Sequence, residues 1–185
     1  MLTNCDKLGA MTPEQAHFVM NEVYIPQIEN EHKTTRRVIE SVPADKGDYA
    51  PDPKSMTAWT LAKHIASSES FFMNGTANGA FDRADGAVPE SVQTPADLVK
   101  WYDEVHTKAI AKLKVTKGED LAKNITFAIF TLPAINYTGL MLSHSAHHRG
   151  QLSAYLRPMG AKVPRIYGGS ADEPIEMPQQ TAAQH

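Results

Sequence analysis

Three of the chain's eight histidines lie within five positions of one another, in the segment HSAHH at residues 144–148. The surrounding residues have a helical pattern, and an α-helix turns about 100° per residue, so positions four apart lie on nearly the same side. Large apolar residues at helical spacing form one face of this helix: Tyr137, Met141, Leu152, Tyr155 and Met159. We therefore expect His144 and His148 to lie within or beside the apolar face and His147 to point away from it.

Two imidazoles one helical turn apart can bind the same divalent cation. Two protein ligands rarely suffice, and His64, on the apolar stripe of another helix, is the candidate for a third ligand. Three neutral imidazoles with one open position are typical of catalytic rather than structural zinc sites. Nickel, cobalt and iron also accept nitrogen ligands, so the pattern predicts one divalent transition metal ion, with zinc or nickel as first choices. By spacing alone, ordinary core histidines remain the alternative.

The residues that follow the histidine pair suggest supporting roles. Gln151 lies one turn beyond His148, where it can hydrogen-bond a ligand histidine. Arg149 faces another helix, and we expect either an ion pair between helices or an anion-binding role there. Gly150 costs on the order of 1 kcal/mol relative to alanine inside a helix. We interpret it as a sign of close helix contact or ligand approach.

The remaining histidines are weaker candidates. His32 lies on the core stripe of the first helix, so we expect it to pack there or to support a ligand or substrate, with direct coordination as the alternative. His106 lies at the flank of its helix's stripe, His17 near a helix start and His185 at the end of the chain. We interpret these three as ordinary histidines without a functional role.

Other catalytic patterns lack essential residues. The segment GGSADE at residues 168–173 has neither the lysine nor the following helix of a phosphate-binding loop. The Glu-x-x-His pattern of di-iron bundles is missing from the last predicted helix. Cys5, the single cysteine, has no evident base beside it and cannot form an intrachain disulfide. We interpret Ser67, Ser68 and Glu69 as residues that pack against neighbouring helices or contact solvent rather than as a catalytic group.

Composition limits the partners and the compartment. The formal net charge is -3, and no lysine and arginine cluster indicates a nucleic-acid partner. The first residues lack a basic region followed by a continuous apolar run, so no signal peptide is predicted. No window approaches the roughly 18 apolar residues that a membrane span needs. We expect a cytoplasmic protein, and the lone cysteine fits a reducing compartment.

Four helical segments are predicted to position the histidines. The first runs from its cap Thr12 to Pro43 and is kinked or divided at Pro26; the second covers residues 55–75 and ends at Asn74-Gly75. The third begins at the cap Thr94 with Pro95 behind it, and the last covers residues 133–159 and is closed by Gly160. Residues 125–132 fit either a short strand or an irregular connection. These elements predict an all-α protein, a four-helix bundle with long connections.

The core faces of the first three helices follow from helical spacing. They are Phe18, Ile25, Ile28, His32, Thr35 and Ile39; then Leu61, His64, Ile65, Ser68 and Phe72; then Leu98, Tyr102, Val105, Ala109 and Leu113. We expect residues 1–172 to form a single domain, and residues 173–185, at the end of an irregular tail rich in proline and glutamine, to be flexible.

Three segments together resemble the DinB family, the DinB/YfiT-like group of metal-binding four-helix bundles. They are LAKHIASSESFF (residues 61–72), HSAHHRGQLSAYLRPMG (residues 144–160) and VPRIYGGSADE (residues 163–173). The resemblance covers residues 15–172, and its most specific part is H-x-x-x-H-R-G-Q. It implies that His144 and His148 are metal ligands and that His64 occupies the place of the family's third ligand.

The resemblance also implies a function. Members implicated in catalysis are metal-dependent enzymes that act with low-molecular-weight thiols, including bacillithiol S-transferases and mycothiol-dependent isomerases, and many members pair into homodimers. By this resemblance the chain is expected to activate a small thiol for transfer to an electrophile. Two alternatives stay open: a metal-dependent hydrolase of a small ester or amide, with Glu69 or Glu31 as general base, and a non-catalytic, stress-related metal-binding protein.

Overall fold

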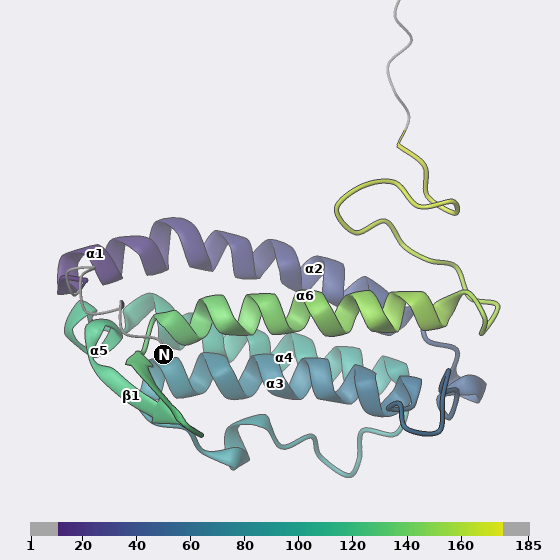
Figure 1. The fold of residues 1–185 in the computed structure, drawn as a ribbon, viewed down its shortest axis with the longest axis horizontal. Coiled ribbons are helices and arrows are strands. Elements are labelled where there is room, and N and C mark those ends of the chain that lie inside the picture. Colours follow the sequence, from purple (N-terminus) through teal and green to yellow (C-terminus); the bar gives the residue numbers. More distant parts are fainter. Residues whose placement is uncertain (1–10, 176–185) are drawn as a thin grey trace, which may run out of the picture.

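Four long helical segments lie side by side among residues 11–175, the part of the chain that this computed structural model describes (Figure 1). The first segment joins α1 (Pro13–Phe18), a π-helix (Val19–Tyr24) and α2 (Ile25–Glu40). The others are α3 (Ala58–Asn78), α4 (Pro95–Val115) and α6 (Asn136–Leu156), with 3-10 turns at Ala44–Lys46 and Arg83–Gly86 and a short α5 (Gly118–Ala122). The predicted four-helix bundle is confirmed.

The connections set the directions of the helices. After α3, residues 79–94 run back along the outside of the bundle before α4 begins (Figure 1). As a result α3 and α4 run in the same direction, opposite to α2 and α6. The helix α3 packs against both α4 and α6, and α2 also packs against both of them. This arrangement places α3 beside α6, the two helices that carry the predicted metal ligands.

The helix starts follow local capping chemistry. The side chains of Thr12 and Thr94 each accept a hydrogen bond from the third residue of the helix, and Gln15 and Asp97 return a bond to the cap backbone. Both predicted caps are present, and each forms a capping box. Thr57 caps α3 by accepting from the Thr60 amide. These caps fix where α1, α3 and α4 begin and hence which turn His64 and His106 occupy.

The predicted break at Pro26 is replaced by a wider turn. Residues Val19–Tyr24 form a π-helix in which the Ile25 amide donates to the Met20 carbonyl, so the chain continues as a helix through Pro26. Each π turn contains more residues than an α turn, which shifts the side-chain positions before it relative to those after it. The expectation that Phe18 faces the core is therefore wrong: it is 62% exposed, whereas Ile25 is buried.

The end predicted for α3 is also wrong. The helix continues through Asn74-Gly75 to Asn78, and Gly79, with a φ of 71°, ends it. Gly75 is inside the helix because the Phe81 ring lies against it, and a Cβ there would be only 2.2 Å from that ring. The glycine marks a close packing contact rather than a helix end.

The ambiguous segment before the last helix is a β-hairpin. Strands β1 (Asn124–Phe127) and β2 (Phe130–Pro133) pair antiparallel, with Ile125 opposite Leu132. Pro133 ends β2, so α6 begins three residues later than predicted and ends at Leu156, before the turn that leads to Gly160. The Tyr137 hydroxyl donates to the Phe130 carbonyl at 2.8 Å, which ties the hairpin to the first turn of α6.

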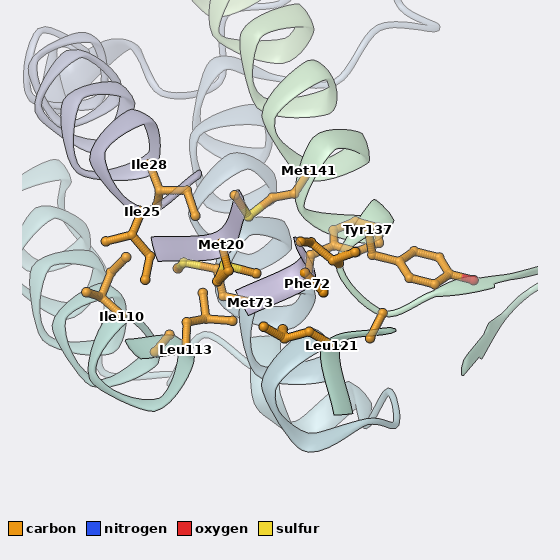
Figure 2. Packing of buried hydrophobic residues seen from close by; sticks show 14 of the residues in the cluster. Met20, Ile25, Ile28, Phe72, Met73, Ile110, Leu113, Leu121, Tyr137 and Met141 are labelled. Atoms are coloured by element: carbon orange, nitrogen blue, oxygen red, sulfur yellow. The ribbon is translucent and has the colours of Figure 1, made fainter. Parts of the chain in front are cut away.

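The bundle contains two hydrophobic clusters, one toward each end. Figure 2 shows the cluster beside the hairpin, where residues of the π-helix, α2, α3, α4, α5 and α6 point toward one another. It includes Met20, Ile28, Phe72, Leu113 and Met141. The second cluster includes Ile39, Leu61, Ile65, Leu98 and Leu152. Between the two clusters lie polar residues, here called the polar layer: the half-buried His32 and the buried Thr35, Glu69, His106, Ser145 and Arg149.

The segment after α6 is irregular and returns to the bundle. Glu173 pairs with Arg37 of α2 at 2.6 Å, and Asp172 pairs with Arg157 at 2.8 Å. The later part of the predicted flexible tail lies outside the described residues, as do Cys5 and His185. Among the helices of residues 11–175, none combines the length and the apolar composition that crossing a membrane requires.

Candidate metal centre

The structure brings His64, His144 and His148 together between α3 and α6. His144 and His148 project from successive turns of α6, and His64 reaches them from α3. One nitrogen of each ring belongs to a set whose members all lie within 4.8 Å of one another. All three side chains are half-buried. His64 and His144 are 80 positions apart in the sequence. The convergence of the three histidines that their spacing predicted is therefore present in the fold.

The rings stand in close mutual contact. The Nε2 atoms of His64 and His144 are 3.2 Å apart, and the ring centroids of the three pairs are separated by 4.4–4.9 Å. Two nitrogens bound to one tetrahedral zinc ion at about 2.0–2.1 Å would be about 3.3 Å apart. The observed separation of His64 and His144 fits that value, so this geometry is compatible with a divalent metal ion.

The electrostatic environment keeps His64 and His144 neutral. Burial, reinforced by the neighbouring imidazoles, lowers the pKa of His144 to about 4. Burial and the neighbouring His148 also lower the pKa of His64. A neutral imidazole has a free lone pair on one ring nitrogen, and a protonated one has none. At neutral pH these two rings therefore offer nitrogen donors rather than positive charges.

Two polar neighbours orient the rings. The Gln151 Oε1 atom lies 2.7 Å from His148 Nδ1. Because an amide oxygen can only accept, Nδ1 carries the proton and the lone pair of this ring is on Nε2. Ser68 Oγ is 3.5 Å from His64 Nδ1. The contact predicted between Gln151 and a ligand histidine is present, and it selects the tautomer that suits metal binding.

Arg149 points to the opposite side of α6. Its side chain is 1% exposed and pairs with Glu31 of α2 at 2.5 Å. It also donates to Thr35 Oγ1 at 3.0 Å and to the Tyr167 hydroxyl. Of the two roles considered for this residue, the inter-helix ion pair is the one that its contacts provide.

Gly150 does not have the surroundings expected of it. It is exposed, and a Cβ built there would meet no atom within 4 Å. The interpretation that this glycine allows a close helix contact is therefore wrong. Gly150 lies on the side of α6 that faces away from the bundle.

Other functional candidates gather in the polar layer rather than at the triad. His32 stacks on His106 with ring centroids 3.7 Å apart, and its Nε2 is 2.9 Å from Asp103. Glu69 is 2% exposed and His106 4% exposed, so His106 lies inside the bundle rather than at the flank of its helix's core face, and Glu69 is packed rather than solvated. Helical spacing could have identified Glu69 as a core-facing residue, because it lies four positions after Ile65 and three before Phe72.

Comparison with known proteins gives consistent matches. The model of the DinB superfamily matches residues 27–152. The uncharacterized protein YjoA of Bacillus subtilis is 29% identical over 129 residues, which are 68% of this chain and 82% of YjoA. The uncharacterized protein YrdA of the same organism is 33% identical over 91 residues, which are 48% of this chain and 52% of YrdA.

Two crystal structures resemble the fold. The DinB-like protein YjoA from Bacillus subtilis superposes with a TM-score of 0.67 at 26% identity, covering 78% of this chain and 96% of that chain. A DinB-like protein from Bacillus cereus ATCC 10987 superposes with a TM-score of 0.68 at 22% identity, covering 80% of this chain and 97% of that chain. The second likeness concerns the fold alone. Both cover nearly the whole of the matched chains.

Proposed function

Because this chain belongs to the DinB superfamily, we propose that His64, His144 and His148 hold one divalent transition metal ion, zinc or nickel, which activates a small thiol for transfer to an electrophile. The observation that carries the proposal is the convergence of three imidazoles, each offering one nitrogen, within 4.8 Å. This donor set is neutral, so a bound dication would keep its full charge and would favour an anionic fourth ligand.

When bound, the ion supplies Lewis-acid chemistry, because it lowers the pKa of a thiol or a water at its open position. In thiol transfer, the thiol loses its proton to solvent and its sulfur forms a bond to the electrophilic carbon. The leaving group departs from that carbon with the bonding electron pair. The histidines act as positioning ligands throughout, and Gln151 holds His148 in the tautomer whose Nε2 lone pair is free.

The two alternatives have less support. A hydrolase of this type needs a carboxylate base near the triad, but Glu31 is paired with Arg149 and Glu69 accepts from the Tyr102 hydroxyl. A purely structural metal would be expected in a closed site with four protein ligands. The triad offers three.

Metal content and thiol transfer are the measurements that test the proposal. Tag-free protein, incubated with zinc or nickel and desalted, is compared with the His64→Ala/His148→Ala variant by mass spectrometry for metal. We expect one fewer equivalent in the double variant. Consumption of thiols such as cysteine, glutathione or coenzyme A with an aryl halide should be catalysed by the wild type and lost in the variant.

A matched control separates ligand loss from the general loss of a histidine. His17 is exposed on α1, so His17→Ala should keep both metal and turnover. Equal metal content in wild type and double variant would contradict the proposed ligands. Metal bound at the triad without turnover by any thiol, together with unchanged folding of the metal-free form, would favour a non-catalytic metal-binding protein instead.

The family resemblance also suggests a homodimer, and we propose this as the state in solution. Light scattering during gel filtration should then give a mass about twice the 20.3 kDa of one chain. A mass equal to one chain over the micromolar range would contradict it.

A further inference from the structure

A second group of potential metal ligands lies in the polar layer, apart from the triad. It consists of His32 from α2, Glu69 from α3 and His106 from α4. One ligand atom from each of these residues belongs to a set within 4.8 Å of one another. The two rings are stacked, and Glu69 and His106 are buried. Three different helices thus supply two imidazoles and a carboxylate at one point inside the bundle.

Each member of this group has a buried polar atom with no hydrogen-bond partner among the described residues. These atoms are His32 Nδ1, Glu69 Oε1 and His106 Nε2. Buried polar atoms are nearly always paired, because leaving one unpaired is costly. The Ser145 hydroxyl, which lies near enough to Glu69 to lower the pKa of its carboxyl, is also unpaired within residues 11–175. A ligand from outside the protein chain would supply the missing partner to these neighbouring atoms.

The other ring nitrogen of His32 and the other carboxylate oxygen of Glu69 are hydrogen-bonded within the protein, which leaves His32 Nδ1 and Glu69 Oε1 free to bind a ligand. His32 Nε2 donates to Asp103 Oδ1 at 2.9 Å, which places the lone pair of the ring on Nδ1. The Tyr102 hydroxyl donates to Glu69 Oε2, which leaves Oε1 free. A histidine that donates its other ring nitrogen to a carboxylate is the usual arrangement for a metal ligand in proteins. Arg36 in turn holds Asp103 at 3.0 Å.

Charge and access also fit a cation. Burial raises the pKa of the Glu69 carboxyl to about 6, although the Tyr102 and Ser145 hydroxyls and Arg149 act in the opposite direction. A bound cation would stabilise the charged form of this buried carboxylate. A cavity of about 440 Å³ between α2 and α4 is lined by His32 and His106 together with Glu29, Lys33, Ile110 and Lys114. This cavity gives an ion a route from solvent to the stacked rings.

We propose that His32, Glu69 and His106 form a second divalent transition metal site in the core of the bundle, independent of the triad. Two imidazoles and one carboxylate suit zinc and also iron(II) or cobalt(II). Asp103 is a positioning residue for this site, since it orients His32 without contacting the ion.

Metal titration of the His64→Ala/His148→Ala variant tests the proposal, because that variant lacks the triad but retains the core group. With zinc or cobalt(II), we expect about one remaining equivalent in the full-length variant. Adding Glu69→Gln or His106→Gln should remove that equivalent. Adding Asp103→Asn, a change at a partly exposed position, should weaken binding by roughly 10–100-fold.

The controls separate this site from the triad and from surface binding. Adding His17→Gln should change nothing, because His17 is exposed. If the triad-deleted variant does not fold, Glu69→Gln in the otherwise unchanged protein should lose one equivalent while the triad keeps its own. No ion in the triad-deleted protein, or an ion that Glu69→Gln and His106→Gln leave in place, would overturn the proposal. A buried water joining the three atoms would give the first of these results.

Discussion

Arg149 is a fully charged side chain with almost no exposed surface. It lies in the polar layer, where its guanidinium meets Glu31 and Thr35 of α2 and the hydroxyl of Tyr167 from the irregular C-terminal segment. A buried charge is tolerated in a protein only when such partners replace water. Arg149 therefore joins three parts of the chain at one point, and its contacts explain why an arginine follows the histidine pair.

Replacing this residue should be costly. Arg149→Met keeps much of the side-chain volume but removes the only charged partner that Glu31 has among the described residues and leaves it the Tyr167 hydroxyl. We expect the free energy of unfolding to fall by about 3 kcal/mol. Urea unfolding followed by circular dichroism measures the change. Arg157→Met is the matched control, because its pair with Asp172 is exposed and should contribute about 1 kcal/mol or less. Similar losses in the two variants would contradict the role given to Arg149.

The buried titratable groups predict how stability depends on pH in the metal-free protein. Burial lowers the pKa of His106 to about 3 and that of His144 to about 4. Below pH 6.5 these two histidines are therefore protonated in the unfolded chain but remain neutral in the folded protein. The free energy of unfolding falls as the pH falls. Glu69 opposes this between about pH 4.5 and 6, because burial raises its pKa to about 6 and the folded protein takes up that proton first.

His32 and His64, whose pKa values burial also lowers, act in the same direction as His106 and His144. The free energy of unfolding should therefore fall by at least about 1 kcal/mol per pH unit between pH 6 and 4.5. Urea unfolding at several pH values, in the presence of a chelator, measures the slope. Glu69→Gln removes the opposing carboxyl group and should make the slope steeper. A flat profile in the wild type would show that these groups titrate as they do in the unfolded chain.

Among the elements, the first helical segment shows how a proline is accommodated without a break. Proline has no amide proton and disturbs the preceding helical turn. Here the π-helix at Val19–Tyr24 precedes Pro26 and takes up the disturbance as a wider turn. The following helix α2 consequently places His32 and Thr35 toward α4 and α6, which is the orientation that the polar layer requires.

Two glycines inside long helices should respond in opposite ways to alanine. Gly75→Ala places a Cβ against the Phe81 ring, which packs against the hydrophobic cluster beside the hairpin, and we expect it to lower the free energy of unfolding by about 1–3 kcal/mol. Gly150→Ala meets open space and should raise it by up to about 1 kcal/mol, since alanine favours the helix. Thermal unfolding of both variants distinguishes the two environments, and a loss in Gly150→Ala would show an undetected contact.

At the scale of the molecule, the polar layer lies between two hydrophobic clusters that are complete without it. Each cluster contains residues of all four long helices, so the packing that holds the bundle together does not depend on metal ligands. We therefore expect the fold to survive metal removal. The proposed metal centre would thus be an addition to a stable scaffold, in contrast to small zinc domains that fold only with their ion.

Metal removal should lower stability without unfolding the protein. Binding of an ion to the folded state alone stabilises it by about 2.7 kcal/mol when free metal is 100 times the dissociation constant. Chelator-treated protein should thus keep its helical circular dichroism signal and unfold at lower urea than the reloaded form. The His64→Ala/His148→Ala variant should respond less to the same treatment. Complete unfolding by the chelator would indicate a structural metal.

Much of the fold was predictable from the sequence because its signals are local. Capping residues at Thr12 and Thr94 fix helix starts, and a period of 3.6 residues identifies which side chains share a face. The same periodicity put His144 and His148 on one side of α6 and pointed to His64 as their partner. Local signals misled where the meaning of a residue depended on a distant contact, as for Gly75 beside Phe81 and Phe18 before the π-helix.

Only the tertiary structure decided which faces meet. Helical periodicity assigns a residue to one face of its helix. It does not determine how that helix is rotated in the bundle or which other helix packs against that face. For that reason the sequence by itself indicated the triad on α3 and α6, whereas the grouping of His32, Glu69 and His106 required three helices to be packed against one another. Their burial, and hence their shifted pKa values and unpaired atoms, exists only once that packing has excluded water.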